Sequence, residues 1–250
     1  MRLQNKVAVI TGAASGFGAG TARLFATEGA AVVVADISDE AGESVVDSIN
    51  TTGGKAVYVH ADVTSRDDTR NMIDAAEKLG GRLDILINNA GGPAPGDFRD
   101  WDRETWIAAL DANMLTAIFL IKATVDGMIE RRFGRIVNIG SINGQAGQYG
   151  QVNYAAAKSG IHGFTKALAQ EGAAKGITVN AICPGGFMTE PNLKWASQNP
   201  AIIESFKEQI PAGDFGQPED LGPLAVYLAS DAARYVTGAS IVIDGGYTLW

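Results

Sequence analysis

The stretch VAVITGAASGFG, residues 7–18, joins a run of β-branched residues to a turn rich in glycine. Branched side chains favour strands, and we expect one over Val7–Ile10. Residues Phe17–Glu28 carry apolar side chains at helical spacing and end at Gly29, so a helix is predicted there. A strand, a glycine-rich turn and a helix in this order predict the first unit of a parallel sheet that binds a dinucleotide.

Three glycines punctuate this turn, at Gly12, Gly16 and Gly18. Because they lack Cβ atoms, they let the backbone approach a pyrophosphate, to which the helix N-terminus offers free N–H groups. Their spacing differs from the common GxGxxG form. Many glycine-rich turns bind nothing, so the turn alone does not establish the site.

A second apolar run, Ala31–Ala35, predicts a strand that ends at Asp36. A carboxylate there accepts hydrogen bonds from the adenosine ribose and repels a 2′-phosphate. Ser15 and Ile37, where a cation would bind such a phosphate, are uncharged. We therefore expect NAD as the cofactor rather than NADP. Asp36 could instead cap the next helix, although Ser38 is also able to do so.

Five further apolar runs alternate with helical segments. They predict strands over Val57–His60, Asp84–Asn88, Arg135–Ile139, Ile177–Ile182 and Ile241–Ile243. Near-continuous apolar strands separated by helices indicate a parallel sheet covered on both faces. The predicted fold class is α/β: a single-domain Rossmann fold over residues 1–250, with a doubly wound seven-stranded parallel sheet.

Tyr154 and Lys158 lie four residues apart in NYAAAKSG, and Ser141 precedes the tyrosine by thirteen residues. Positions i and i+4 share a helix face, and the alanines between them favour a helix. A phenol titrates near pH ~10, so it needs a neighbouring positive charge to act as an acid and base at neutral pH. Lys158 is placed to supply that charge, although such a pair occurs by chance on many helices.

Together these residues resemble the pattern of the short-chain dehydrogenase/reductase family, over the whole chain. The matching segments are TGAASGFG (11–18), Asp36, NNAG (88–91), Asn113, Ser141, YAAAK (154–158), and Pro184-Gly185 with Thr189. Residues 141–185 are most similar to acetoacetyl-CoA and 3-oxoacyl reductases. Two positions depart from the pattern: Phe17 replaces the usual Ile or Leu, which should change packing only, and Asp214 replaces a common Arg.

The resemblance implies a role for each matching residue. Tyr154 would protonate a carbonyl oxygen as the nicotinamide delivers hydride to the carbon, and Ser141 would polarise that oxygen. Lys158 would lower the pKa of Tyr154 and bind the nicotinamide ribose. Asn113 would help hold a water that connects Lys158 to solvent, or it could simply bond to the backbone. The implied cofactor-binding residues are Gly12, Ser15, Gly16, Phe17, Gly18, Asp36, Ile37, Asp62 (toward the adenine amino group), Val63, Asn89, Ala90, Gly91, Tyr154, Lys158, Pro184, Gly185, Phe187 and Thr189.

Two variable segments are expected to choose the substrate. Gly91–Phe98 is rich in Gly and Pro and predicts a loop over the site. Residues 187–217 interrupt the strand and helix alternation, and their apolar side chains predict a lid, or equally packing on the domain or at a subunit contact. The candidate substrate residues are Gln148, Tyr149 and Gln151, from the resemblance, and Trp195 from the lid.

The substrate is expected to be a small or medium ketone or secondary alcohol. A 3-oxoacyl thioester, on coenzyme A or an acyl carrier protein, is the alternative, but no basic cluster stands out to bind its carrier, and such reductases commonly prefer NADP. A non-redox NAD enzyme is disfavoured by the short chain. A non-catalytic NAD-binding protein is disfavoured by the intact Tyr154 and Lys158.

Composition limits the partners. The 250 residues are 46% hydrophobic and carry a net charge of −8, which argues against nucleic acid or an anionic membrane surface. Residues 1–6 contain no apolar signal segment, and no run approaches the ~20 apolar residues of a membrane span, so we expect a cytoplasmic protein. Cys183 is expected to pack in the core, and His60 and His162 are too few for a typical zinc site, so no metal is predicted.

The chain ends in the apolar residues Tyr247, Leu249 and Trp250, which seldom stay in water. The family resemblance implies pairing of long helices and of last strands between subunits. We therefore expect a homotetramer or homodimer.

Overall fold

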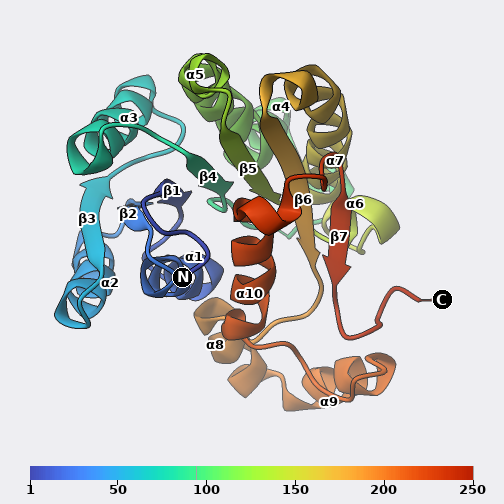
Figure 1. The fold of residues 1–250 in the computed structure, drawn as a ribbon. Coiled ribbons are helices and arrows are strands. Elements are labelled where there is room, and N and C mark those ends of the chain that lie inside the picture. The colour runs from blue at the N-terminus through green and yellow to red at the C-terminus, as the bar shows by residue number, and fades with distance from the viewer. Residues whose placement is uncertain (94, 250) are drawn as a thin grey trace.

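In the computed structural model, which describes residues 1–93 and 95–249 apart from the side chains of Pro191 and Trp195, seven parallel strands form one sheet (Figure 1). Their order is β3-β2-β1-β4-β5-β6-β7. The bounds are β1 Val7–Thr11, β2 Ala31–Asp36, β3 Lys55–His60, β4 Ile85–Asn88, β5 Gly134–Ile139, β6 Ile177–Pro184 and β7 Ser240–Ile243. The predicted Rossmann fold is confirmed. The strand order reverses between β1 and β4, which is where such sheets bind ligands.

Helices cover both faces of the sheet (Figure 1). One layer holds α1 Gly16–Thr27, α2 Asp39–Thr51 and α10 Pro218–Ala229; the other holds α3 Arg66–Gly80, α4 Arg103–Leu110, α5 Thr116–Arg131 and α7 Val152–Gly172. Successive residues of a strand face opposite sides. Ile85 and Ile87 accordingly pack in the core under the first layer, whereas Leu86 packs under the second. This two-sided burial explains why the strands read as unbroken apolar runs.

A two-helix excursion leaves the sheet after β6. It contains α8 Glu190–Gln198 and α9 Pro200–Gln209. Its two ends are joined by backbone hydrogen bonds, from Gly216 N to Gly186 O (3.0 Å) and from Met188 N to Gly216 O (2.9 Å). The segment expected to form a lid is thus an excursion whose two ends are held together by backbone hydrogen bonds next to β6. The remaining short helices are η1 Phe98–Asp100, α6 Asn143–Ala146, η3 Ala173–Lys175 and η4 Asp231–Ala233.

Helices α4 and α5 are joined through a π-helical turn, η2 Asp111–Leu115, into one stretch over Arg103–Arg131. By length and composition alone this stretch could cross a membrane, because an 18-residue window within it has a mean hydropathy of 1.5. The expectation that no segment approaches a span is therefore wrong on those two criteria. Leu120, Ile121 and Met128 of the stretch are buried in the core, as in a helix that packs on a sheet. Its outer face exposes Ile107 and Phe119.

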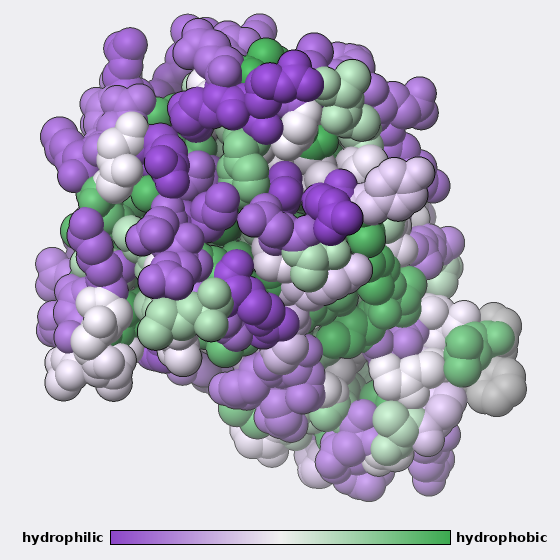
Figure 2. Space-filling model, viewed as in Figure 1, coloured by the Kyte–Doolittle hydropathy of each residue, from purple (hydrophilic) through white to green (hydrophobic). Residues whose placement is uncertain are grey.

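The sheet has an open edge at β7, where all four residues are half-buried. Hydrophobic side chains gather over β6 and β7 on the face seen in Figure 2. Leu249, beyond this strand, exposes 76% of its surface. Trp250 lies outside the described residues.

Candidate active site

The glycine-rich turn lies between β1 and α1, and at two of its glycines the chain itself leaves no room for a Cβ atom. A Cβ atom on Gly18 would overlap the carbonyl oxygen of Gly12, and one on Gly12 would lie 2.9 Å from Cα of Ala90. At Gly16, by contrast, a Cβ would be 3.6 Å from the nearest atom, in Thr189. Gly16 does have φ +49°, which side chains rarely adopt, and the expectation that all three glycines make room for a pyrophosphate stays a prediction. Gly16 opens the space before the α1 N-terminus, and this helix end fits a dinucleotide phosphate.

The substitution Gly18→Ala tests this distinction. We expect it to lower the free energy of unfolding by about 1–3 kcal/mol, because the added methyl collides with backbone that cannot move cheaply. Gly20→Ala, in the same helix, is the matched control. Its Cβ would meet no atom closer than 3.8 Å, so it should be neutral or stabilise the fold by up to about 1 kcal/mol. Urea unfolding measures both, and equal effects would contradict the assignment.

Asp36 fastens the glycine-rich turn to the end of β2. Its Oδ2 accepts a hydrogen bond from Ala14 N (2.9 Å) and its Oδ1 accepts one from Ser38 N (3.0 Å). It is not the cap of α2, whose N-cap residue is Ser38. The carboxylate thus has a structural role that the sequence did not reveal. Each oxygen retains a further lone pair, so the predicted contact with a ribose stays a prediction.

The other residues expected around the cofactor line the same sheet edge. Asn89 donates through Nδ2 to the carbonyl oxygens of Thr11 and Gly12, both at 2.9 Å, and so ties the turn after β4 to the end of β1. Asp62 is occupied locally: its Oδ1 accepts from the backbone N (2.9 Å) and the hydroxyl (2.7 Å) of Thr64. These bonds lower the pKa of Asp62. Ile37 exposes 66% of its surface directly after β2.

Ser141, Tyr154 and Lys158 come together where β5 ends against α7. Lys158 is buried, donates through Nζ to Ile139 O (2.8 Å) and lies 5.4 Å from the centre of the Tyr154 ring. Ser141 hydrogen-bonds the Tyr154 hydroxyl, and its Oγ accepts from Asn143 N at 3.1 Å. The helix predicted from the alanines therefore places the pair as expected, on the face that packs on the sheet.

Burial sets the protonation of this trio. It raises the pKa of Tyr154, and the Ser141 hydrogen bond opposes it in part. Burial also lowers the pKa of Lys158 to about 8. The expected lowering of the tyrosine pKa is thus wrong in direction for this structure. The physical reason is that the phenol is largely buried, which disfavours its charged form.

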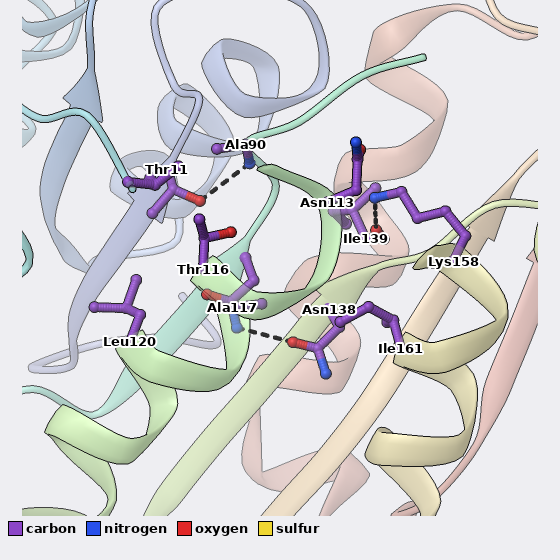
Figure 3. A pocket seen from close by; sticks show the side chains of 12 residues that line it. Thr11, Ala90, Asn113, Thr116, Ala117, Leu120, Asn138, Ile139, Lys158 and Ile161 are labelled. Atoms are coloured by element: carbon purple, nitrogen blue, oxygen red, sulfur yellow. Dashed lines mark hydrogen bonds between the residues drawn. The ribbon is translucent and has the colours of Figure 1, made fainter. Parts of the chain in front are cut away.

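Asn113 sits in the π-helical turn, a distortion common at functional sites. Its Nδ2 donates to Ala109 O (3.0 Å) and Gly92 O (3.1 Å). Its buried Oδ1 has no hydrogen-bond partner within the described residues. This residue and Lys158 line a small cavity of about 10 Å³, room for roughly one water (Figure 3). The amide nitrogen thus bonds to the backbone, while the role of the oxygen in holding a water stays a prediction.

Phe17, which replaces the Ile or Leu usual in the family pattern, packs against one specific residue. Its ring meets the ring of Phe187 edge to face, with centroids 4.9 Å apart. Phe187 is only 4% exposed and its ring also covers Gly216, so it belongs to the base of the excursion. The prediction that Phe17 affects packing agrees with this contact. The contact also links the start of α1 to the base of residues 187–217.

The candidate substrate residues separate into two groups. Gln148 and Gln151 both accept hydrogen bonds from Asn143, a residue that the sequence did not single out. Tyr149 exposes 98% of its surface and projects into solvent, so the structure does not bring it to the trio. The side chain of Trp195 lies outside the described residues.

The neighbouring elements are placed as expected. The loop Gly91–Phe98, described except for residue 94, bonds through Gly96 N to Gly150 O at 2.9 Å, beside the start of α7. Pro184 ends β6, and Gly185 N donates to Ile243 O (2.9 Å). Val63 lines the cavity. Cys183 is buried 3.2 Å from His162 Nε2, and burial raises the pKa of its thiol to about 11, which suits packing.

Comparisons with known proteins agree with this geometry. A family model described as enoyl-(acyl carrier protein) reductase matches residues 12–248. The 3-oxoacyl-[acyl-carrier-protein] reductase of Thermotoga maritima is 40% identical over 100% of both chains, and the acetoacetyl-CoA reductase of Shinella zoogloeoides is 42% identical over 97% of this chain and 98% of its own. A solved structure from Beutenbergia cavernae, described as a candidate NAD(P)-dependent gluconate 5-dehydrogenase with NADP bound at low occupancy, is 34% identical and superposes with a TM-score of 0.93 over 99% of this chain and 98% of its own. The chain belongs to the short-chain dehydrogenase/reductase family, whose members are oxidoreductases that act on CH–OH groups with a nicotinamide cofactor.

Proposed function

We propose that this enzyme interconverts a small or medium ketone and the corresponding secondary alcohol, with NAD(H) as its cofactor. The observation that carries the proposal is the meeting of Ser141, Tyr154 and Lys158 where β5 ends, close to the sheet's switch point. The bound cofactor would supply or accept the hydride. Gly16 and the α1 N-terminus are proposed to hold its pyrophosphate.

The trio divides the proton chemistry among its members. In the reduction direction Tyr154 donates its phenolic proton to the carbonyl oxygen, and in oxidation the phenolate takes it back. Ser141 donates a hydrogen bond to the same oxygen. The Lys158 charge stabilises the phenolate that forms, and a water held by Asn113 carries protons between Lys158 and solvent. Because burial raises the pKa of Tyr154, its phenolate depends on the Ser141 hydrogen bond and on the Lys158 charge for stabilisation.

Reduction of a 3-oxoacyl thioester is the second candidate. The names of the Thermotoga and Shinella relatives favour it, at 40% and 42% identity. The gluconate dehydrogenase description of the Beutenbergia structure points instead to a hydroxylated substrate. A panel of free ketones, polyols and 3-oxoacyl thioesters, followed at 340 nm with the purified enzyme, separates these candidates. Turnover of thioesters alone would overturn the first proposal.

The choice of NAD over NADP rests on Asp36, whose negative charge would repel a 2′-phosphate. The NADP in the Beutenbergia structure argues the other way. We expect wild type to favour NADH over NADPH in kcat/KM, and Asp36→Asn to reduce that preference by roughly tenfold or more. Because Asn also loosens the bonds to Ala14 and Ser38, both cofactors should bind more weakly, but only their ratio reports the phosphate. A wild-type preference for NADPH would overturn this role.

We further propose a cytoplasmic homotetramer or homodimer, with neither nucleic acid nor membrane as partner. The exposed Ile107 and Phe119 on the α4–α5 stretch and the open edge of β7 offer two apolar surfaces to a second copy. The net charge of −8 argues against anionic partners. A monomer in light scattering, or partition of the protein into detergent, would contradict this assembly.

A further inference from the structure

A buried thiol and a buried imidazole lie behind the loop that carries Ser141. They belong to Cys183 and His162, and Cys183 Sγ lies 3.2 Å from His162 Nε2. The proton chemistry of the trio uses neither group. The sulfur of the same thiol accepts a hydrogen bond from the main-chain N–H of Ser141. A chain of contacts therefore runs from the imidazole through the thiol to the serine.

The ring of His162 packs closely against two glycines that flank Ser141 in the sequence. A Cβ atom on Gly140 would be 2.6 Å from Nε2 of the ring, and one on Gly144 would be 2.8 Å from its Cε1. Real Cβ atoms essentially never approach another atom to less than 3.0 Å. Only glycine at these two positions therefore lets the imidazole lie so close to the loop that carries the serine.

The contacts of the thiol indicate which atoms carry protons. Burial raises the pKa of the Cys183 thiol to about 11, so the thiol keeps its proton at neutral pH. Because the sulfur accepts from Ser141 N, its S–H group is left to donate, and Nε2 of His162 is the acceptor at 3.2 Å. The imidazole must then be neutral, with its own proton on Nδ1. Burial and the charges of Lys158 and Lys166 lower the pKa of His162, which keeps the ring neutral.

We propose that His162 is a positioning residue whose neutral form, acting through the Cys183 thiol, holds Ser141 in place for catalysis. The inference rests on the proposed ketone reduction. Protonation of His162 would replace the acceptor at Nε2 with an N–H donor, so the thiol would lose its acceptor and two N–H groups would compete for the sulfur. The charged and titratable groups that face the ring are Lys158 and Lys166 on α7 and Cys183 on β6, whereas residues 140–147 bring no charged side chain.

A double-mutant cycle tests whether His162 acts through Ser141. His162→Leu keeps a buried side chain of similar size that accepts no hydrogen bond, and we expect kcat for ketone reduction by NADH to fall roughly tenfold. Ser141→Ala should lower kcat by roughly 10²-fold or more. In the double variant the leucine should add less than about twofold, because the serine through which it acts is already gone. Equal losses from His162→Leu in both backgrounds would overturn the inference.

The pH profile of reduction separates positioning from packing. Tyr154 and Lys158 both hold their protons in acid, so they cause no loss of rate there. We expect kcat to fall as the pH drops below 6.5 and His162 takes up a proton. His162→Gln accepts the thiol proton through Oε1 but cannot be protonated, so it should keep most of the rate and lose this acid limb. His60→Gln, at the other histidine of the chain, should keep the limb, and a limb that persists in His162→Gln would contradict the proposal.

An infrared measurement tests the same contact without turnover. The chain has a single cysteine, so the S–H stretching band reports Cys183 alone. Because donation to Nε2 weakens the S–H bond, the band of wild type should lie at a lower frequency than that of His162→Leu. Equal frequencies would overturn the inference and leave the proposed function intact. If the band shifts as expected but wild type reduces no ketone of the panel, the contact is real and the proposed function fails, together with the catalytic role of the contact.

Discussion

Replacing Tyr154 with phenylalanine is expected to lower kcat by roughly 10²–10⁴-fold, the usual contribution of a positioned acid and base. The change removes only the hydroxyl that bonds Ser141. The ring and its contact with the Lys158 ammonium remain, so the free energy of unfolding should change by no more than about 1 kcal/mol. Steady-state rates with the best substrate of the panel, alongside urea unfolding, measure both effects.

The control for this variant is Tyr235→Phe, which removes the same hydroxyl from a side chain that exposes 98% of its surface. It should match wild type in rate and in stability. Binding of NADH, followed by its fluorescence, should fall far less than kcat in Tyr154→Phe, since the substitution leaves Asp36 and Gly16 intact. A Tyr154→Phe enzyme that retains wild-type kcat would show that Tyr154 is not the acid.

The fold was predictable because its strands are buried on both faces. Ile85, Leu86 and Ile87 are all apolar because one faces the second helix layer and two face the first, so the strand is visible as a continuous run. The seven predicted strands each fall within two residues of the observed bounds. The glycines of the turn were equally easy to recognise in the sequence, but the contacts that require a glycine at each position were not. Gly18 is fixed by a carbonyl six residues away and Gly12 by the turn after β4, contacts that no local pattern reveals.

The sequence predicted which residues form the candidate site. It did not predict how their surroundings shift the pKa values of Tyr154 and Lys158. Helical spacing placed Tyr154 beside Lys158. The burial that raises the pKa of Tyr154 and lowers that of Lys158 comes from the packing of α7 against β6, α6, α4 and η2, which the spacing of the residues does not show. Asn143 escaped notice because a single polar residue after Ser141 carries no periodic signal. It bonds Gln148 and Gln151 because a turn with Gly150 at positive φ brings those two side chains together.

Replacing Lys158 with methionine is expected to make the protein more stable and nearly inactive. Burial lowers the lysine pKa from 10.5 to about 8, a difference that corresponds to roughly 3 kcal/mol of penalty on the charged native form at pH 7. Methionine has a similar length and no charge, but it forfeits the hydrogen bond to Ile139 O. The net gain in the free energy of unfolding should therefore be about 1–3 kcal/mol. The rate should fall by roughly 10²-fold or more, since the phenolate loses its counter-charge.

The pH dependence separates this explanation from simple repacking. Between pH 8 and 10.5 the native lysine has released its proton while the unfolded chain still holds it, so raising the pH stabilises the wild-type protein through this group. The stability advantage of Lys158→Met should accordingly be full below pH 8 and vanish as the pH rises through 10.5. The Lys158 charge also lowers the pKa values of His162 and Cys183, so the difference between the two unfolding curves reports the lysine together with its coupling to these two groups. Lys166→Met, at an exposed position of the same helix, should show neither the gain nor the pH dependence. A Lys158→Met protein that is less stable than wild type at pH 7, or whose advantage stays constant up to pH 10, would mean that the buried ammonium is not the strained group that its surroundings imply.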